Sequence, residues 1–349
     1  IHRAPLANID GFAIGQGKLS VSGLVLPPDG DPRLVSVTGE KGVAYEFIYP
    51  LPSPSARDIY WYWPNGDYSG YQLVIDLAQT RHIGTSYAFM FGFGSGDVDK
   101  CADIKNTFWI PKEINAYQNY PPQDNLKRVQ AFDNISGVTV RGYSDSRRIW
   151  EIANRYGLDC TGAKVLDWGA GHGRVIRHFH SLDTSVRAYS IDIDEENVAW
   201  AREHLAAVFV SHGPLMPPTV YPNDEFDLIY GISVMTHLTR SVQKAWLGEI
   251  RRILSPGGRA LLTFAGDTAT AFSSRFLDKT WMEGYLYSGR GRDLPSDDLV
   301  GKISDPNYYK NVTISSVEVA RLCEPYFEVL DVLECMFGYQ DLAVLAKAA

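Results

Sequence analysis

The chain has 349 residues, of which 45% are hydrophobic, so it is long enough to build one large core or two. Its net charge of −8 at pH 7 lacks the basic surplus typical of nucleic-acid binders, and we expect no nucleic-acid partner. It contains no apolar run of about 18 residues and no visible signal peptide, which predicts no transmembrane segment and a cytoplasmic location.

Four cysteines are scattered along the chain: Cys101, Cys160, Cys323 and Cys335. None belongs to a C-x-x-C pair or lies near a histidine at the spacing of a zinc site. A disulfide framework is also unexpected in a chain this long and this poor in cysteine. The sequence therefore predicts free thiols and no structural metal.

Residues 1–97 have the character of an all-β accessory domain. Short alternating or apolar runs, such as Lys18–Leu26 and Tyr71–Ala78, are separated by turn clusters rich in Pro, Gly, Asp and Ser. This spacing predicts a β-sandwich. The aromatic run Tyr60–Trp63 could stack on sugars, but we interpret it as a core strand, because alternate aromatic side chains fill a small sandwich core.

Residues 98–142 show little periodicity and are expected to be a connector. The pattern then changes, because residues 144–157 have apolar side chains at helical spacing, with Ser144 as N-cap candidate and Gly157 as C-cap candidate. Strand and helix signals alternate from there to the end of the chain. This alternation predicts an α/β domain over residues 143–349, with a mostly parallel Rossmann-like sheet and helices on both faces.

The first strand of that domain, residues 164–168, runs straight into the glycine-rich loop DWGAGHG. The strand ends on an acid, Asp167, and Gly169 and Gly171 would let the backbone approach a ligand closely. A purely structural turn is the alternative. The loop differs from the dinucleotide-binding G-x-G-x-x-G, since Arg174 stands at the final glycine position. An NAD-dependent oxidoreductase is therefore the weakest interpretation.

A second acid, Asp192, ends the next predicted strand. A carboxylate at this position can accept hydrogen bonds from both hydroxyls of a ribose, as it does in dinucleotide-binding folds. Asp194 lies closer to the following helix and is better interpreted as its N-cap. Two acids on neighbouring strands thus predict a nucleoside-binding edge of the sheet.

Four blocks resemble, in order and spacing, those of class I S-adenosylmethionine-dependent methyltransferases: VLDWGAGHGRV, AYSIDID, FDLIYGISVMTHL and EIRRILSPGGRALLTF. They look like that family's glycine loop, ribose-binding acid, segment after strand four and turn before strand five. The last two strands resemble its reversed terminal hairpin. The resemblance implies a seven-stranded methyltransferase sheet, S-adenosylmethionine as cofactor and S-adenosylhomocysteine as product.

The resemblance also implies the roles of individual residues. Asp167 and the glycine loop would lie against the cationic amino-acid part of the cofactor, Asp192 would hold the ribose, and Ile193 would pack on the adenine. His212 departs from the acid or amide that family members often carry near the adenine. The implied cofactor-binding residues are Asp167, Trp168, Gly169, Ala170, Gly171, Asp192, Ile193, Tyr230 and Gly231.

His237 is the candidate catalytic residue. It follows the fourth strand of the domain, at the rim where the methyl group should point, and a histidine is a suitable base for a hydroxyl acceptor. The alternative is a histidine that bonds within the start of the next helix. His172, in the glycine loop, is more consistent with packing or solvent exposure. No acid–Asp-Asn trio follows strands four and five, so the sequence predicts no metal.

Residues 268–311 are expected to form an insert near the acceptor site, with aromatic walls, or else a self-packed surface subdomain. Its aromatic candidates are Trp281, Tyr285, Tyr287, Tyr308 and Tyr309. The chain is similar, more loosely, to bacterial methyltransferases of glycan and polysaccharide biosynthesis, which implies O-methylation of a sugar or glycan hydroxyl. The alternatives are a methyltransferase for small-molecule natural products and a catalytically silent glycan-binding or scaffold protein.

Overall fold

The computed structural model describes residues 5–80, 87–94, 104–112, 114, 119–130, 134–274, 292–295 and 308–348. The chain divides into two compact units. The first unit combines Ile1–Tyr120 with Asp133–Arg148, and the second combines Pro121–Phe132 with Ile149–Ala349. The chain therefore enters the second unit, returns to the first and enters the second again. Residues 98–142, expected to be a connector, are shared between the two units.

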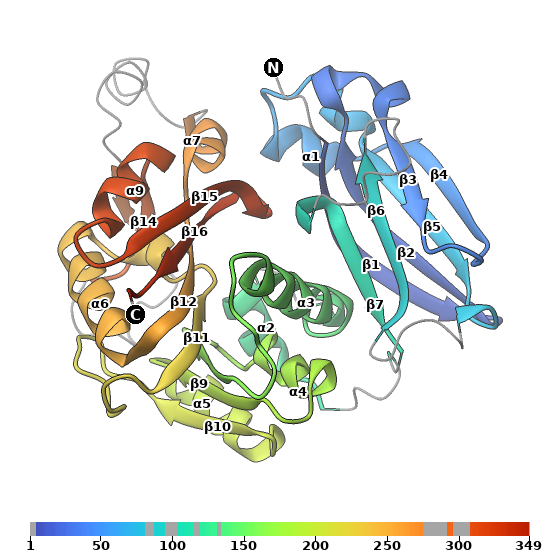
Figure 1. The fold of residues 1–349 in the computed structure, drawn as a ribbon. Coiled ribbons are helices and arrows are strands. Elements are labelled where there is room, and N and C mark those ends of the chain that lie inside the picture. Colours follow the sequence, from blue (N-terminus) through green and yellow to red (C-terminus); the bar gives the residue numbers. More distant parts are fainter. Residues whose placement is uncertain are drawn as a thin grey trace. The chain divides into compact units, whose positions relative to one another are not determined.

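Seven strands form two antiparallel sheets in the first unit (Figure 1), in the orders β1-β2-β5-β4 and β3-β6-β7. Their bounds are β1 (Leu6–Gly15), β2 (Lys18–Leu26), β3 (Ser36–Gly39), β4 (Tyr45–Leu51), β5 (Gly70–Asp76), β6 (Tyr87–Gly94) and β7 (Thr107–Pro111). Leu19 and Leu73 of the first sheet share one buried core with Phe89 and Phe91 of the second. The expected all-β region is confirmed as two sheets that bury one core between them.

The aromatic run Tyr60–Trp63 is not a strand, so this prediction was wrong. It follows α1 (Pro54–Ile59), where a proline at the start favours a helix over a strand. Tyr60 and Trp63 are buried, whereas Trp61 is 50% exposed. The indole Nε1 of Trp63 donates a hydrogen bond of 2.7 Å to the carbonyl oxygen of Pro27. Trp63 thus anchors a turn of the first unit and does not contribute to a strand ladder.

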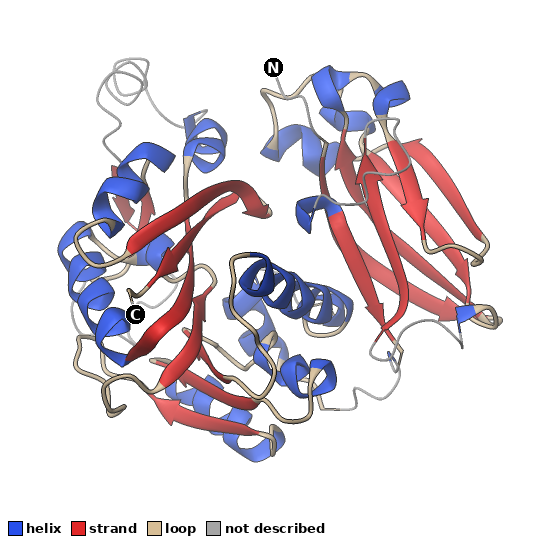
Figure 2. Ribbon diagram, viewed as in Figure 1, coloured by secondary structure: helices blue, strands red, loops and turns tan. Residues whose placement is uncertain are grey.

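Seven further strands form one mixed sheet in the second unit (Figure 2), in the order β10-β9-β8-β11-β12-β16-β15. Their bounds are β8 (Lys164–Trp168), β9 (Arg187–Asp192), β10 (Val208–His212), β11 (Phe226–Gly231), β12 (Leu254–Phe264), β15 (Glu328–Phe337) and β16 (Gln340–Ala346). Strands β8 to β12 pair in parallel, and β16 is antiparallel to both β12 and β15. The predicted seven-stranded Rossmann-like sheet with a reversed terminal hairpin is confirmed.

Helices cover both faces of this sheet. On one face, Trp246 of α6 and Val319 of α9 pack in a core with Leu262 of β12. On the other face, Phe179 of α4 stacks on Tyr230 of β11 with ring centroids 5.5 Å apart. The helices and the remaining two-stranded sheet are α2 (Gln123–Gln130), α3 (Val140–Arg155), α4 (Phe179–Leu182), α5 (Glu195–His204), α6 (Arg240–Ile253), α7 (Asp267–Ser274), α9 (Ser316–Cys323), β13 (Arg292–Pro295) and β14 (Lys310–Thr313).

Two of the three predicted helix caps are confirmed. Asp194 is the N-cap of α5, and its side chain accepts a hydrogen bond of 3.0 Å from the backbone N–H of Glu196. Gly157 follows α3 with φ +86°, the left-handed conformation of a C-cap. Ser144 is not an N-cap, because α3 begins at Val140. Its hydroxyl instead accepts a hydrogen bond from the backbone N–H of Trp109.

Cys160, Cys323 and Cys335 form no disulfide bond in the described part of the chain, and Cys101 lies outside it. Within that same part, no helix combines the length and the apolar character that crossing a bilayer requires.

Replacement of Trp63 by Phe tests the anchoring role of the indole. The substitution removes the donor to Pro27 but keeps an aromatic ring, so we expect the first unit to lose about 1–2 kcal/mol of unfolding free energy. Trp61→Phe, at an exposed position, should change it by less than about 0.5 kcal/mol. Scanning calorimetry measures both variants. Equal midpoints for the two would contradict the anchoring role.

Candidate functional site

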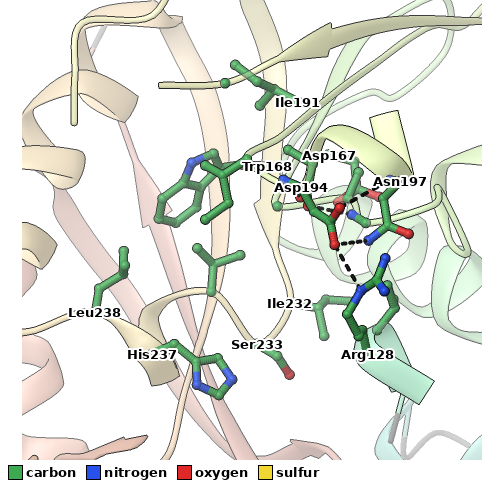
Figure 3. A pocket seen from close by; sticks show the side chains of 18 of the residues that line it. Arg128, Asp167, Trp168, Ile191, Asp194, Asn197, Ile232, Ser233, His237 and Leu238 are labelled. Atoms are coloured by element: carbon green, nitrogen blue, oxygen red, sulfur yellow. Dashed lines mark hydrogen bonds and ion pairs between the residues drawn. The ribbon is translucent and has the colours of Figure 1, made fainter. Parts of the chain in front are cut away.

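A cavity lies where the carboxyl ends of β8, β9 and β11 meet in the second unit (Figure 3). Open α/β sheets usually bind ligands at this edge. Seven of the nine predicted cofactor-binding residues line the cavity: Asp167, Trp168, Gly169, Ala170, Gly171, Asp192 and Ile193. The predicted catalytic residue, His237, lines it as well. The structure therefore brings the glycine loop, the acid of the second strand and the histidine to one cavity.

The other two predicted residues, Tyr230 and Gly231, are not among those that line the cavity. Tyr230 stacks on Phe179 of α4, on the same face of the sheet as Asp167, and its hydroxyl group lowers the pKa of Asp167. At Gly231, a Cβ atom would approach Trp168 to 2.8 Å. Neither residue lines the cavity, but Tyr230 acts on Asp167 and the absence of a side chain at Gly231 leaves room for Trp168.

The glycine loop requires its glycines for two reasons. Gly169 and Gly171 have φ values of +74° and +56°, which side-chain-bearing residues rarely adopt. A Cβ at Gly169 would also lie 2.2 Å from a methyl group of Val234. The backbone N–H of Gly169 donates a hydrogen bond of 2.8 Å to the carbonyl oxygen of Ile191, so the loop is tied to β9.

Asp192 holds the same loop through its side chain. One carboxylate oxygen accepts a hydrogen bond of 2.6 Å from the N–H of Gly171, and the other accepts one of 2.7 Å from the N–H of Asp194. Burial raises the pKa of Asp192, and these two hydrogen bonds partly offset that effect. A carboxylate offers about four lone-pair sites, so Asp192 retains capacity for two hydroxyl donors from a ligand.

Asp167 is a buried acid on the wall of the cavity, with only 4% of its surface exposed. Burial raises the pKa of Asp167 to about 7, although the hydrogen bond from Tyr230 and the charge of Arg174 act in the opposite direction. The carboxyl group is thus held partly protonated near neutral pH. A cation in the cavity would favour its ionised form, and the site is suited to a positively charged ligand.

His237 approaches the cavity from the loop after β11, on the same side as Leu238 (Figure 3). Its ring stacks on that of Tyr309, with centroids 4.4 Å apart and an interplanar angle of 8°. The backbone of Leu238 forms an antiparallel bridge with Tyr309. Tyr309, near the end of the predicted insert, therefore fixes the orientation of the histidine ring.

Tyr308 and Tyr309 are the two aromatic candidates of residues 268–311 that the structure describes, and both line the cavity. The Tyr308 hydroxyl donates a short hydrogen bond to the carbonyl oxygen of Leu215. Trp281, Tyr285 and Tyr287 lie outside the described residues.

His172 is fully buried, which agrees with packing and excludes solvent exposure. Burial, together with Arg174 and Arg177, lowers the pKa of His172 to about 3, so the ring is neutral at physiological pH. It lies edge-on to Trp200, with centroids 6.1 Å apart. His212 is not among the residues that line the cavity.

Several cavity residues were not predicted from the sequence, among them Arg128 and Val129 of α2 and Trp246 of α6. Trp246 looked like an ordinary core residue of an amphipathic helix. Arg128 and Val129 belong to the segment that was expected to be a connector. Residues 123–130 have a short helical pattern, but nothing in it indicates that Arg128 contacts a residue more than sixty positions further along the chain.

Residues 165–258 match the family model described as a methyltransferase domain. The ubiquinone/menaquinone biosynthesis C-methyltransferase UbiE of Burkholderia vietnamiensis is 30% identical over 112 residues, which cover 29% of this chain and 42% of that relative. The chain thus spans less than half the length of this relative. The residues matched by the family model all lie in the second unit.

Two solved structures are similar to part of this chain. The PH0226 protein from Pyrococcus horikoshii OT3 has a TM-score of 0.43 and 18% identity, with 63% of this chain and 97% of that chain covered. The 1,6-didemethyltoxoflavin-N1-methyltransferase of Burkholderia thailandensis, solved with S-adenosylhomocysteine bound, has a TM-score of 0.41 and 18% identity, with 60% and 85% covered.

Asp167→Asn should stabilise the ligand-free protein at high pH. A raised pKa means that the contribution of Asp167 to stability is fully present below its ordinary pKa of 3.8 and is lost as pH rises to about 7. The neutral amide avoids this loss, so we expect a gain of about 4 kcal/mol at pH 8 that shrinks toward pH 5. Thermal unfolding across this pH range measures it, with the exposed Glu203→Gln as control. An unchanged or lower midpoint at pH 8 would show that the ionised form of Asp167 is not penalised.

Proposed function

We propose that this protein is a class I S-adenosylmethionine-dependent methyltransferase and that its cofactor binds in the cavity at the ends of β8, β9 and β11. One observation carries the proposal: two acids on neighbouring strands, the buried Asp167 and the half-buried Asp192, line one cavity together with the glycine loop. The methyltransferase-domain match over residues 165–258 covers both acids and this loop.

The residues present fit this cofactor part by part. Asp192 would accept the ribose hydroxyls, because its oxygens have acceptor sites beyond the two used by backbone N–H groups. Asp167 would face the ammonium and sulfonium charges, which supply the cation that its buried carboxyl group lacks. Ile193 lines the cavity beside Asp192 and would pack on the adenine. When bound, the cofactor supplies the methyl group for transfer.

For the acceptor, we propose a hydroxyl group of a sugar or glycan, which would place the protein in polysaccharide biosynthesis. His237 lines the cavity and is held by its stack on Tyr309, so it could take up the proton that an acceptor hydroxyl loses. Tyr308 and Tyr309 would supply an aromatic wall for the acceptor. A small-molecule natural product with a hydroxyl group would use the same arrangement and is the second candidate.

A catalytically silent glycan-binding or scaffold protein is the alternative outside enzymology. Such a protein has no need for a buried acid whose ionised form is disfavoured, and Asp167 is held in this way. It also has no need for the positive φ values at Gly169 and Gly171. These features favour a second unit that binds a positively charged ligand.

Calorimetric titration with S-adenosylmethionine, S-adenosylhomocysteine and NAD tests the cofactor. We expect micromolar binding of the first two and none of NAD. Asp192→Ala should weaken S-adenosylhomocysteine binding by about 100-fold or more, because two charge-assisted hydrogen bonds are lost. Glu203→Ala, on the exposed side of α5, is the matched control and should bind normally. Normal binding by Asp192→Ala would overturn the assigned ribose site, and no binding by the wild-type protein would favour the scaffold alternative.

His237→Ala separates binding from turnover. Nucleotide sugars and glycans are screened first for release of S-adenosylhomocysteine. On any substrate found, we expect the variant to bind S-adenosylhomocysteine like the wild type but to turn over about 100-fold or more slowly, because the base is lost. His180→Ala, at an exposed position, should keep full activity. Unchanged turnover in His237→Ala would reduce His237 to a structural role.

A further inference from the structure

Helix α2 belongs to the second unit although it precedes the first strand of that unit by more than thirty residues. Two of its residues, Arg128 and Val129, line the cavity. Val129 lies directly on the glycine loop, because a Cβ atom at Gly171 would come within 2.6 Å of one of its methyl groups. The helix therefore forms one wall of the cavity and touches the loop.

A network of polar side chains joins α2 to the first turn of α5. The guanidinium of Arg128 donates from Nε to Asp194 at 3.0 Å (Figure 3). From Nη2 it donates to Glu196 at 2.7 Å. One turn earlier on α2, the amide of Asn125 donates a hydrogen bond of 2.8 Å to Asn197. Asn197 in turn donates to Asp194 at 3.1 Å. Asp194 thus receives one hydrogen bond from Arg128 and another from Asn197, which is itself held by Asn125.

The network is mostly buried. The side chain of Asp194 is 6% exposed and that of Arg128 is 21% exposed, whereas that of Glu196 is 62% exposed. Asn125 and Asn197 are also buried. The bond between Arg128 and Asp194 is therefore weakly screened by solvent, and removing the cation would leave a buried carboxylate without its charged partner. The contact with Glu196 is weaker because water surrounds that carboxylate.

Asp194 is directly connected to the residue assigned to the ribose. Its backbone N–H donates to one oxygen of Asp192, and its side chain caps α5. The position of this N–H sets the orientation of the Asp192 carboxylate. A force that holds the side chain of Asp194 therefore also orients Asp192.

We propose that Arg128 is a positioning residue for the cofactor and that α2 is the outer wall of the cofactor pocket. Arg128 holds Asp194, and through it Asp192, in the orientation that accepts the ribose hydroxyls. The inference rests on the proposed function, since it assigns a role in binding that cofactor. Loss of Arg128 removes one contact that keeps α2 on the glycine loop, so bound S-adenosylhomocysteine should dissociate faster.

The experiment uses the full chain and S-adenosylhomocysteine as probe. Equilibrium titration gives Kd, and stopped-flow tryptophan fluorescence gives the dissociation rate, since Trp168 lines the cavity. For Arg128→Met we expect Kd to rise at least about tenfold, mostly through faster dissociation. Arg128→Lys should recover part of this loss, because an ammonium can keep one of the two ion pairs. Arg251→Met, at an exposed position of α6, is the matched control and should match the wild type.

A double-mutant cycle distinguishes positioning from general support of the fold. Asp194→Asn keeps an oxygen for capping α5 but loses the charge that Arg128 holds. If Arg128 acts through Asp194, Arg128→Met should have little further effect on Kd in the Asp194→Asn background. Additive effects would overturn the proposed route through Asp194, and Glu196→Gln should change Kd less than twofold.

The possible failures are distinguishable. A wild-type protein that does not bind S-adenosylhomocysteine would overturn the proposed function and this inference with it. Wild-type binding together with an unchanged Kd for Arg128→Met would overturn only the inference. A lower melting temperature of Arg128→Met with the same Kd, measured well below that temperature, would show a purely structural role.

Discussion

The site depends on one constraint, the carboxylate of Asp192 at the end of β9. Its two oxygens accept backbone N–H groups from Gly171 and Asp194, which belong to the glycine loop and to the start of α5. One side chain thus fixes the relative positions of two strand ends and a helix. The positive φ of Gly171 is needed to bring its N–H to this oxygen. The same carboxylate is the proposed acceptor of hydrogen bonds from the ribose, so one group would both shape the cavity and bind the ligand.

Asp167 illustrates the tension between binding and stability. An ionised carboxyl group in this buried position is disfavoured, which is why its pKa rises to about 7. The ionised residue destabilises the ligand-free protein, but it would attract a cation in the cavity. Tyr230 and Arg174 moderate the penalty without removing it. Such a local sacrifice of stability is common at functional sites.

Much of the second unit could be predicted from the sequence, because its signals are local. The strand Lys164–Trp168, the acid at Asp192 and the cap at Asp194 follow from adjacent residues. The errors arose where contacts between residues far apart in the sequence determine the local structure. The run Tyr60–Trp63 has the composition of a strand, but the proline-initiated helix before it places these residues in a turn. The role of Arg128 depends on partners at positions 194 and 196, which a polar helix of eight residues does not reveal.

The path of the chain between the two units limits which parts of the protein could be transferred to another protein as one continuous segment. Residues 121–132 contribute to the second unit, yet the chain returns to the first unit before the sheet of the second begins. During synthesis, the helix that walls the cavity emerges before the strands that it covers, and it must wait for them to fold. A gene fragment that encodes the sheet alone would carry the cavity without this wall. A fragment would therefore preserve the complete site only if it included residues 121–132, and it would then also carry residues 133–148 of the first unit.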